Sequence, residues 1–206
     1  MTAAQRERAA LVDTMRTVGP DAPTLCAGWT TRDLAAHLVV RERSLDATPG
    51  IAIPFLAGYT EKVQRQVAAS ADWDDLLDKI ASGPPLFSPF RLLDPVANMD
   101  EMFIHHEDVR RAQTDWEPRS LDDGTVTALR RPLALMARLT MGKVPAHVTL
   151  ETPEGETVAV VGHGPELIVT GEVSELTLFV AGRDEADLAF SDAQAIAAVR
   201  TARRGL

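Results

Sequence analysis

Hydrophobic residues recur at helical spacing over most of the first 140 positions. Leu11, Val12, Met15 and Val18 are spaced for one helix face, which predicts a helix with a buried stripe from about residue 2 to residue 18. The same period, with start and stop residues, predicts further helices over about 31–43, 55–69, 73–81, 95–113 and 121–139. This part of the chain is therefore expected to be mainly α.

The pattern changes near Gly142. The segment HVTLETPEGETVAVV holds two β-type runs around a Pro-Glu-Gly turn, which predicts a hairpin. After it, ELIVTG predicts a third strand, SELTLFVAG a helix and ADLAF a fourth strand. Ser191 with Gln194 forms a capping box for a final helix to about Arg204. We expect a helical domain over residues 1–142 and a small α+β domain over residues 143–206.

Composition and charge argue against several classes of binding partner and against a membrane protein. With 206 residues, 45% hydrophobic and 25% charged, the chain is typical of a globular protein. Its net charge of −9 argues against nucleic acid and anionic membranes as partners. The longest apolar stretch, residues 51–59, is interrupted by Pro54, whereas a membrane span needs about 20 residues. No secretory signal is present, so we expect a cytoplasmic protein.

Residue usage adds two expectations. The single cysteine, Cys26, excludes an intrachain disulfide and a cysteine-rich zinc finger, and we expect it to be a small core residue rather than a reactive thiol. Arginine outnumbers lysine and alanine is abundant. That usage is typical of high-GC bacterial genomes.

One stretch, DEMFIHHEDVRR, contains candidate metal chemistry. Glu101 and His105 are four residues apart and share one helix face, and a carboxylate beside an imidazole can bind a divalent transition metal. The pair alone is weak evidence, because two ligands do not make a site. His37, which lies between Leu34 and Leu38 on the inward face of the 31–43 helix, is the best candidate for a third ligand.

A His, Glu, His set with an open fourth position is typical of catalytic zinc, and nickel or iron accept the same ligands. The alternative is that His37 is an ordinary core histidine and that Glu101 and His105 form a surface pair. A third interpretation is a metal-free helical protein in which the three side chains form a hydrogen-bonded cluster. The sequence pattern leaves these interpretations open.

Four further polar residues are candidates for the site or for a structural role. Three of them have two possible roles each, and the fourth is expected to be structural. Asp108 either orients His105 as an outer carboxylate or is an exposed acid. Arg41 either meets an anionic substrate or pairs with an acid. His106 points about 100° away from His105 and is expected to be structural. Arg183, after Gly182, is expected to cap a helix end, with binding of a substrate acid group as the alternative.

The stretch TLCAGWTTRDLAAHLVVRER resembles the start of the second helix in the DinB-like superfamily. It is most similar to the branch that contains the mycothiol-dependent maleylpyruvate isomerase N-terminal domain. In that branch a Gly-Trp-Thr loop leads into a helix with a ligand histidine, and a later helix carries Glu-x-x-x-His-His-x-Asp. The matching positions here are Gly28, Trp29, Thr30 and His37, then Glu101, His105, His106 and Asp108.

The resemblance covers about residues 1–140 and implies a DinB-like four-helix bundle with His37, Glu101 and His105 as metal ligands. The tail, with Gly171, the run SELTLF and Gly182-Arg183, is similar to a C-terminal appendage of the same family. We expect that appendage to be shorter than the second domain of the isomerase itself.

The resemblance also implies a chemistry. Mycothiol, a small thiol, would be the co-substrate, and the metal would activate it toward a small electrophilic substrate in a transfer or isomerisation. The alternative is a non-catalytic metal-binding module with a regulatory or interaction role. The sequence carries no signal for an oligomeric state.

Overall fold

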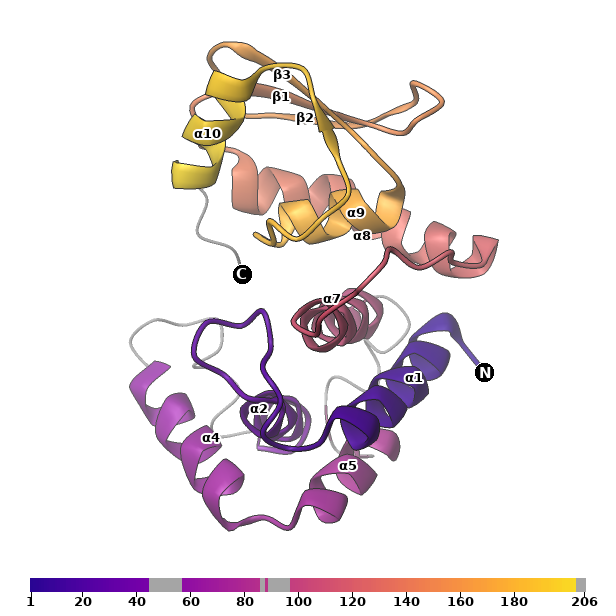
Figure 1. Cartoon of the computed structure of the whole chain (residues 1–206), viewed down its shortest axis with the longest axis vertical. Coiled ribbons are helices and arrows are strands. Elements are labelled where there is room, and N and C mark those ends of the chain that lie inside the picture. Colours follow the sequence, from indigo (N-terminus) through magenta and orange to yellow (C-terminus); the bar gives the residue numbers. More distant parts are fainter. Residues whose placement is uncertain (45–56, 86–87, 89–96, 203–206) are drawn as a thin grey trace. The chain divides into compact units, whose positions relative to one another are not determined.

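The computed structural model describes residues 1–44, 57–85, 88 and 97–202 (Figure 1). Its contacts divide the chain into two compact units, Met1–Trp116 and Glu117–Leu206. The first unit is helical in its described part, and the second combines helices with a four-stranded sheet. The predicted mainly α fold with a small α+β C-terminal part is confirmed.

The first unit contains five described helices. They are α1 (Ala3–Val18), α2 (Thr31–Arg43), α4 (Ala57–Ser70), α5 (Trp73–Ala81) and α7 (Ala97–Arg111). Helices α2 and α5 begin and end where the sequence predicted. The predicted starts of two others, at Phe55 and Pro95, lie outside the described residues.

Local capping explains where the first helices begin. Thr2 Oγ1 accepts a hydrogen bond from the backbone N–H of Gln5, and Gln5 Oε1 in turn accepts one from the backbone N–H of Thr2. Thr30 and Asp33 form the same reciprocal pair at α2, with the Thr30 N–H 2.9 Å from Asp33 Oδ2. Asp72 accepts two backbone N–H bonds at the start of α5. Each pairing satisfies backbone N–H donors that have no partner within the helix. One such cap typically stabilises a protein by about 1 kcal/mol.

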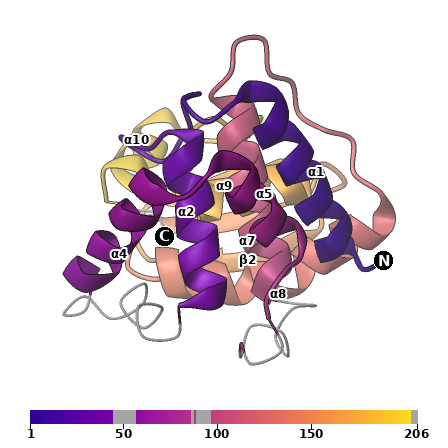
Figure 2. The ribbon, with the colours of Figure 1, turned by 90° about the horizontal axis from the view of Figure 1, so that it is seen from below.

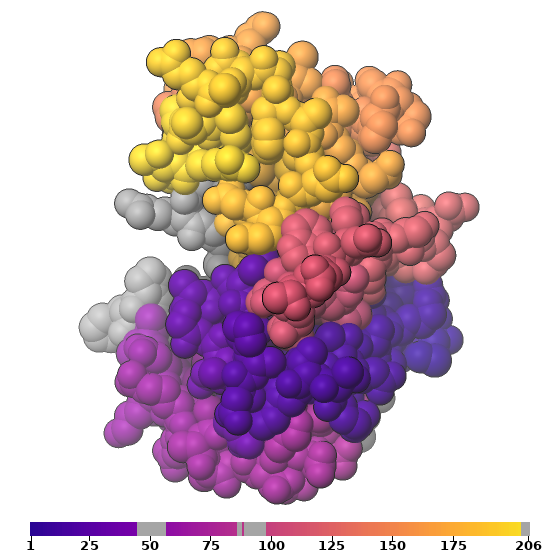
Figure 3. All heavy atoms as spheres, viewed as in Figure 1, coloured from indigo at the N-terminus to yellow at the C-terminus, as the bar shows by residue number. Residues whose placement is uncertain are grey.

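The core of the first unit lies where α1 meets α5 and α7 and where α2 meets α4 and α5. Figure 2 shows α2 between α4 and α5. With all heavy atoms drawn, neighbouring segments of the first unit lie in contact on the face that Figure 3 shows. The fully buried members of this core include Leu11, Met15, Leu34, Leu38, Leu76, Leu77 and Met102.

Buried polar pairs tie these helices together. Arg8 of α1 holds Glu42 of α2 with two hydrogen bonds, at 3.0 and 2.5 Å, and donates a third to the Ile80 carbonyl at 2.9 Å. Because both charged side chains are almost fully buried, each depends on the other to offset the cost of leaving water.

His106 joins α7 to α1. Its Nδ1 lies 2.7 Å from Glu7 Oε1 and its Nε2 lies 2.8 Å from Thr14 Oγ1. Both ring nitrogens therefore have partners on α1, in agreement with the structural role that the sequence indicated.

The second unit contains α8 (Asp123–Met141), β1 (His147–Glu151), β2 (Thr157–Val161), β3 (Glu166–Thr170), α9 (Val173–Val180), β4 (Ala189–Phe190) and α10 (Ala193–Ala202). The strand order is β2-β1-β3-β4. Strands β1 and β2 form the predicted antiparallel hairpin, in which Gly155 has a φ of 82° that favours glycine. Strands β1 and β3 are parallel, and β4 is antiparallel to β3.

Two features differ from the sequence-based expectation. The contacts divide the chain at Trp116, before the boundary expected near Gly142, because α8 packs on α9 and β2. The predicted cap of the final helix is wrong by one residue. Asp192 accepts the Ala195 N–H at 2.6 Å, while the Ser191 hydroxyl accepts the N–H of Ile168.

Within the described ranges, no helix is both long and apolar enough to cross a membrane.

Replacing Arg8 by methionine tests the buried pair. The change leaves the Glu42 carboxylate buried without its guanidinium partner, and we expect the free energy of unfolding to fall by about 3–5 kcal/mol. Urea denaturation of the full chain would measure it. Arg16→Met, at an exposed pair with Asp13 on the same helix, is the matched control and should cost less than about 1 kcal/mol. Equal losses for the two variants would contradict the assignment.

Candidate metal centre

Three polar side chains converge between α2 and α7. His37 comes from α2, and Glu101 and His105 come from successive turns of α7. The Nε2 atoms of both histidines lie 3.4 Å from the same carboxylate oxygen, Glu101 Oε1. One potential ligand atom from each residue lies within 4.8 Å of the other two. The structure thus brings together the three residues that the sequence selected as candidate ligands.

Local sequence explains their placement. The capping pair at Thr30 fixes the start of α2, so that His37 follows on its second turn beside the buried Leu34 and Leu38. The four-residue spacing places Glu101 and His105 one above the other on α7. The three side chains are 13%, 23% and 12% exposed. The cluster is therefore mostly enclosed but still borders solvent.

Each histidine has an acceptor on its outer nitrogen. His105 Nδ1 donates to Asp108 Oδ2 at 2.9 Å, and His37 Nδ1 lies 3.3 Å from Gln64 Oε1 of α4. With an acceptor at Nδ1, the Nε2 atom of each ring faces the cluster. Asp108 is fully buried, so the interpretation as an exposed acid is wrong and the orienting contact is present.

Arg41 lies beside the carboxylate. Its Nε is 3.2 Å from Glu101 Oε1, and its Nη1 donates to Asn98 Oδ1 at 2.8 Å. Of its two interpretations, the structure shows the pairing with an acid. Arg183 belongs to the second unit, where its Nη1 donates to the Ala181 carbonyl beyond the end of α9. A contact of Arg41 or Arg183 with a substrate stays a prediction.

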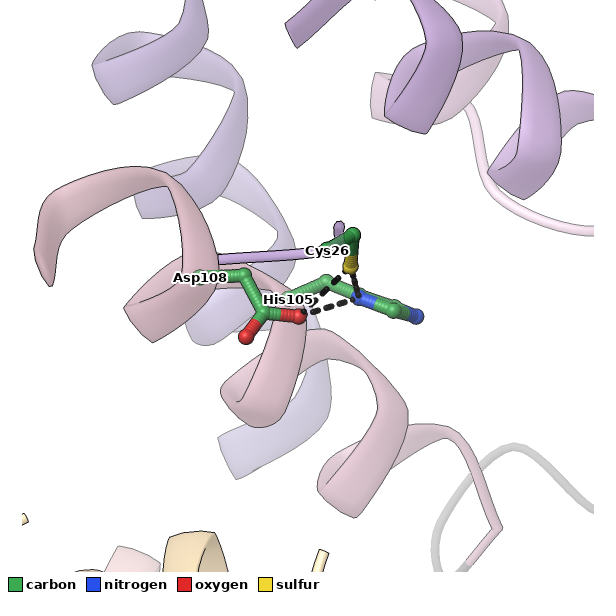
Figure 4. A group of neighbouring side chains, drawn as sticks. All are labelled: Cys26, His105 and Asp108. Carbon is green, nitrogen blue, oxygen red and sulfur yellow. Dashed lines mark hydrogen bonds and ion pairs between the residues drawn. The ribbon is translucent and has the colours of Figure 1, made fainter. Parts of the chain in front are cut away.

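Sequence reasoning missed two neighbours of the cluster. Gln64 has no distinctive pattern around it, because it is one polar residue on an amphipathic helix. Cys26 packs against the core as expected and is partly buried. Its Sγ also lies 3.2 Å from Asp108 Oδ2 and 4.0 Å from His105 Nδ1 (Figure 4). Trp29, from the same loop, places its ring 5.2 Å from that of His37.

The charges of the cluster are strongly coupled. Burial alone would raise the pKa of Glu101, but hydrogen bonds from His105 and His37 and the charge of Arg41 hold that pKa well below its ordinary value. Burial would lower the pKa of His105, yet its bonds with Asp108, Cys26 and Glu101 raise it well above the ordinary value. Without a metal, these shifts of the two pKa values favour an ionised Glu101 and a protonated His105.

The donor set fits a divalent transition metal. Two imidazole nitrogens and a carboxylate oxygen are ligands that zinc accepts at about 2.0–2.2 Å, and tetrahedral ligands at that distance lie about 3.4 Å apart. Both separations measured to Glu101 Oε1 have this value. Cys26, His105 and Asp108 form a second close set that shares His105. In the first set, both histidines can ligate through Nε2 while keeping their bonds at Nδ1.

A family model matches part of the helical unit. Residues 1–83 match the family model of the mycothiol maleylpyruvate isomerase N-terminal domain, which confirms the resemblance for that part of the chain. No curated protein sequence matches the chain.

Solved structures show the same fold. A crystal structure of a histidine-to-alanine variant of mycothiol-dependent maleylpyruvate isomerase superposes with a TM-score of 0.55 at 12% identity, covering 92% of this chain and 90% of that chain. A second crystal structure of that isomerase has a TM-score of 0.48 at 10% identity, with the same coverage. The first match supports the predicted DinB-like fold. Because this match spans 92% of this chain and 90% of the isomerase chain, it contradicts the expectation that the C-terminal appendage is shorter than the second domain of the isomerase.

Asp100, next to the cluster, provides a test of its electrostatics. Burial and the neighbouring Glu101 raise the pKa of Asp100 from 3.8 to about 7. At pH values between these two pKa values, the folded chain keeps a proton on Asp100 that the unfolded chain releases. The free energy of unfolding therefore falls as the pH rises. We expect the metal-free protein to lose up to about 2 kcal/mol of unfolding free energy from this group between pH 5 and 6.5.

Asp100→Asn should remove that loss, because the amide does not titrate. Urea denaturation at the two pH values would measure the slope for the wild type and the variant. Asp13→Asn, at an exposed acid on α1, is the control and should keep the wild-type slope. Identical slopes for all three proteins would contradict the raised pKa of Asp100.

Proposed function

We propose that the chain binds a divalent metal through His37, Glu101 and His105 and acts as a thiol-dependent transferase or isomerase with mycothiol as the thiol. The convergence of two imidazole Nε2 atoms on one carboxylate oxygen carries the proposal. Support for the thiol comes from the match of residues 1–83 to the mycothiol maleylpyruvate isomerase N-terminal domain. Zinc is the expected metal, with nickel or iron as alternatives.

A metal held there would supply Lewis-acid chemistry, which lowers the pKa of a small thiol at an open coordination position. The residues of the chain would bind and orient. Gln64 and Asp108 hold the outer nitrogens of the two histidines, and Arg41 holds the Glu101 carboxylate. To ligate the metal, His105 would have to release its Nε2 proton, so metal affinity should increase with pH.

Two alternatives have distinct consequences. A non-catalytic metal-binding module would use the same ligands but would not respond to a thiol. A metal-free cluster is favoured by one observation, since Arg41 and a protonated His105 already offset the charge of Glu101. Metal binding and thiol binding are therefore tested separately.

Metal binding is tested by removing ligands. We expect the wild type to bind one equivalent of Zn²⁺ in a calorimetric titration, and His37→Ala or Glu101→Ala to weaken the affinity by about 100-fold or more because a ligand is lost. His163→Ala, an exposed histidine of the second unit, is the control and should bind like the wild type. A wild type without stoichiometric binding would favour the metal-free cluster.

Thiol binding is tested with Co²⁺ in place of zinc and with Cys26→Ser as the background, which removes the thiol of the chain itself. Added mycothiol is expected to produce a thiolate-to-cobalt absorption band in the near ultraviolet that saturates with concentration. The same titration with the methylated thioether of mycothiol is the control and should give no band. A cobalt protein without a band at any mycothiol concentration would favour the non-catalytic module.

A further inference from the structure

The loop between α1 and α2 is fastened to α7 at Asp108. The backbone N–H of Leu25 donates to the Asp108 carbonyl at 3.0 Å. The next residue, Cys26, donates its thiol proton to Asp108 Oδ2 at 3.2 Å. The same oxygen accepts the Nδ1–H of His105 at 2.9 Å. Figure 4 shows the sulfur and the imidazole meeting at one carboxylate oxygen.

This oxygen determines how His105 is held. Asp108 is fully buried, so its carboxylate depends on donors from the protein. Its Oδ2 must remain directed at the His105 ring for the opposite nitrogen, Nε2, to face Glu101. A second donor on Oδ2 restricts rotation of the carboxylate, and Cys26 supplies that donor from a different part of the chain.

The loop backbone is set independently of the thiol. The N–H of Trp29 donates to the Cys26 carbonyl at 2.9 Å, and the Thr24 hydroxyl donates to the Trp29 carbonyl at 2.9 Å. Together with the Leu25 bond, these contacts hold the loop without using the Cys26 side chain. Truncation of Cys26 therefore removes a donor and leaves the framework around it.

We propose that Cys26 is a positioning residue of the metal centre, whose thiol fixes the Asp108 carboxylate and through it the orientation of His105. The inference rests on the proposed metal site. It differs from direct ligation by Cys26, since ligation through the second close set would need the His105 Nδ1 that now donates to Asp108.

Three variants test the role. Cys26→Ala removes the donor, and Cys26→Ser restores one as a hydroxyl. Val18→Ala truncates another partly buried side chain that packs on the same core and is the matched control. We expect Cys26→Ala to weaken Co²⁺ affinity about fivefold and to alter the visible cobalt spectrum, because the His105 ring is less constrained. The Co²⁺ affinity of Cys26→Ser should be within about twofold of the wild-type affinity, and that of Val18→Ala should equal the wild-type affinity.

A readout without metal accompanies the titration. In the metal-free protein, the ring Nδ1–H proton of His105 is expected to give an exchange-protected NMR resonance in the wild type and in Cys26→Ser. In Cys26→Ala that resonance should broaden or disappear. A merely structural loss in the core would not be rescued by serine in both measurements.

The outcomes separate the two proposals. A wild type that binds no Co²⁺ overturns the proposed function. The positioning role alone is overturned by a different pair of results. The wild type would bind Co²⁺ through the three ligands, and Cys26→Ala would have the same affinity, cobalt spectrum and His105 resonance as the wild type. The wild type could also show a thiolate-to-cobalt band without added thiol, and Cys26→Ser could lack that band. This result would overturn the positioning role in favour of direct ligation by Cys26.

Discussion

Glu101 carries a negative charge into the space between α2 and α7, and the surrounding polar side chains are arranged to balance it. Two imidazoles and the Arg41 guanidinium all approach its Oε1 atom. A carboxylate in such a place is costly unless it is paired and hydrogen-bonded. The need to balance this charge explains why a helix otherwise lined by Leu34 and Leu38 also turns a histidine and an arginine inward.

The next layer of contacts reaches the two histidines from three different segments of the chain. Gln64 reaches His37 from α4, Asp108 reaches His105 from the same α7, and Cys26 reaches Asp108 from the loop before α2. Each of these contacts acts on the outer side of a ring and leaves its Nε2 atom to the centre. Such outer partners fix ring orientation and tautomer in metal sites.

Part of this arrangement is encoded locally and could be predicted. The reciprocal Thr30 and Asp33 bonds define the start of α2 and hence the level of His37 on it. The four-residue spacing places Glu101 and His105 on one face. Periodicity does not decide which helices become neighbours, however. The position of His37 on an apolar face made it the best candidate for a third ligand, and the family resemblance then supplied the pairing of α2 with α7.

The missed features share a physical cause. An amphipathic stripe shows that α8 is buried on one side, but not which layer covers it, and its partners are α9 and β2. Gln64 and Cys26 contact the cluster through polar atoms whose positions produce no periodic pattern in the sequence. The last helix shows a local competition, in which Ser191 serves the neighbouring strand and Asp192 takes the cap.

The charge balance also bears on what the centre can accommodate. Without a metal, a protonated His105 and Arg41 offset Glu101 and the carboxylate of Asp108. Exchange of the His105 proton for a divalent cation adds one positive charge to a mostly enclosed site that already contains a guanidinium. In such surroundings uncompensated charge is expensive. With a metal bound as proposed, a small anionic ligand such as an ionised thiol would return the total charge to its metal-free value. The electrostatics that can stabilise the metal-free cluster would then favour such an anion.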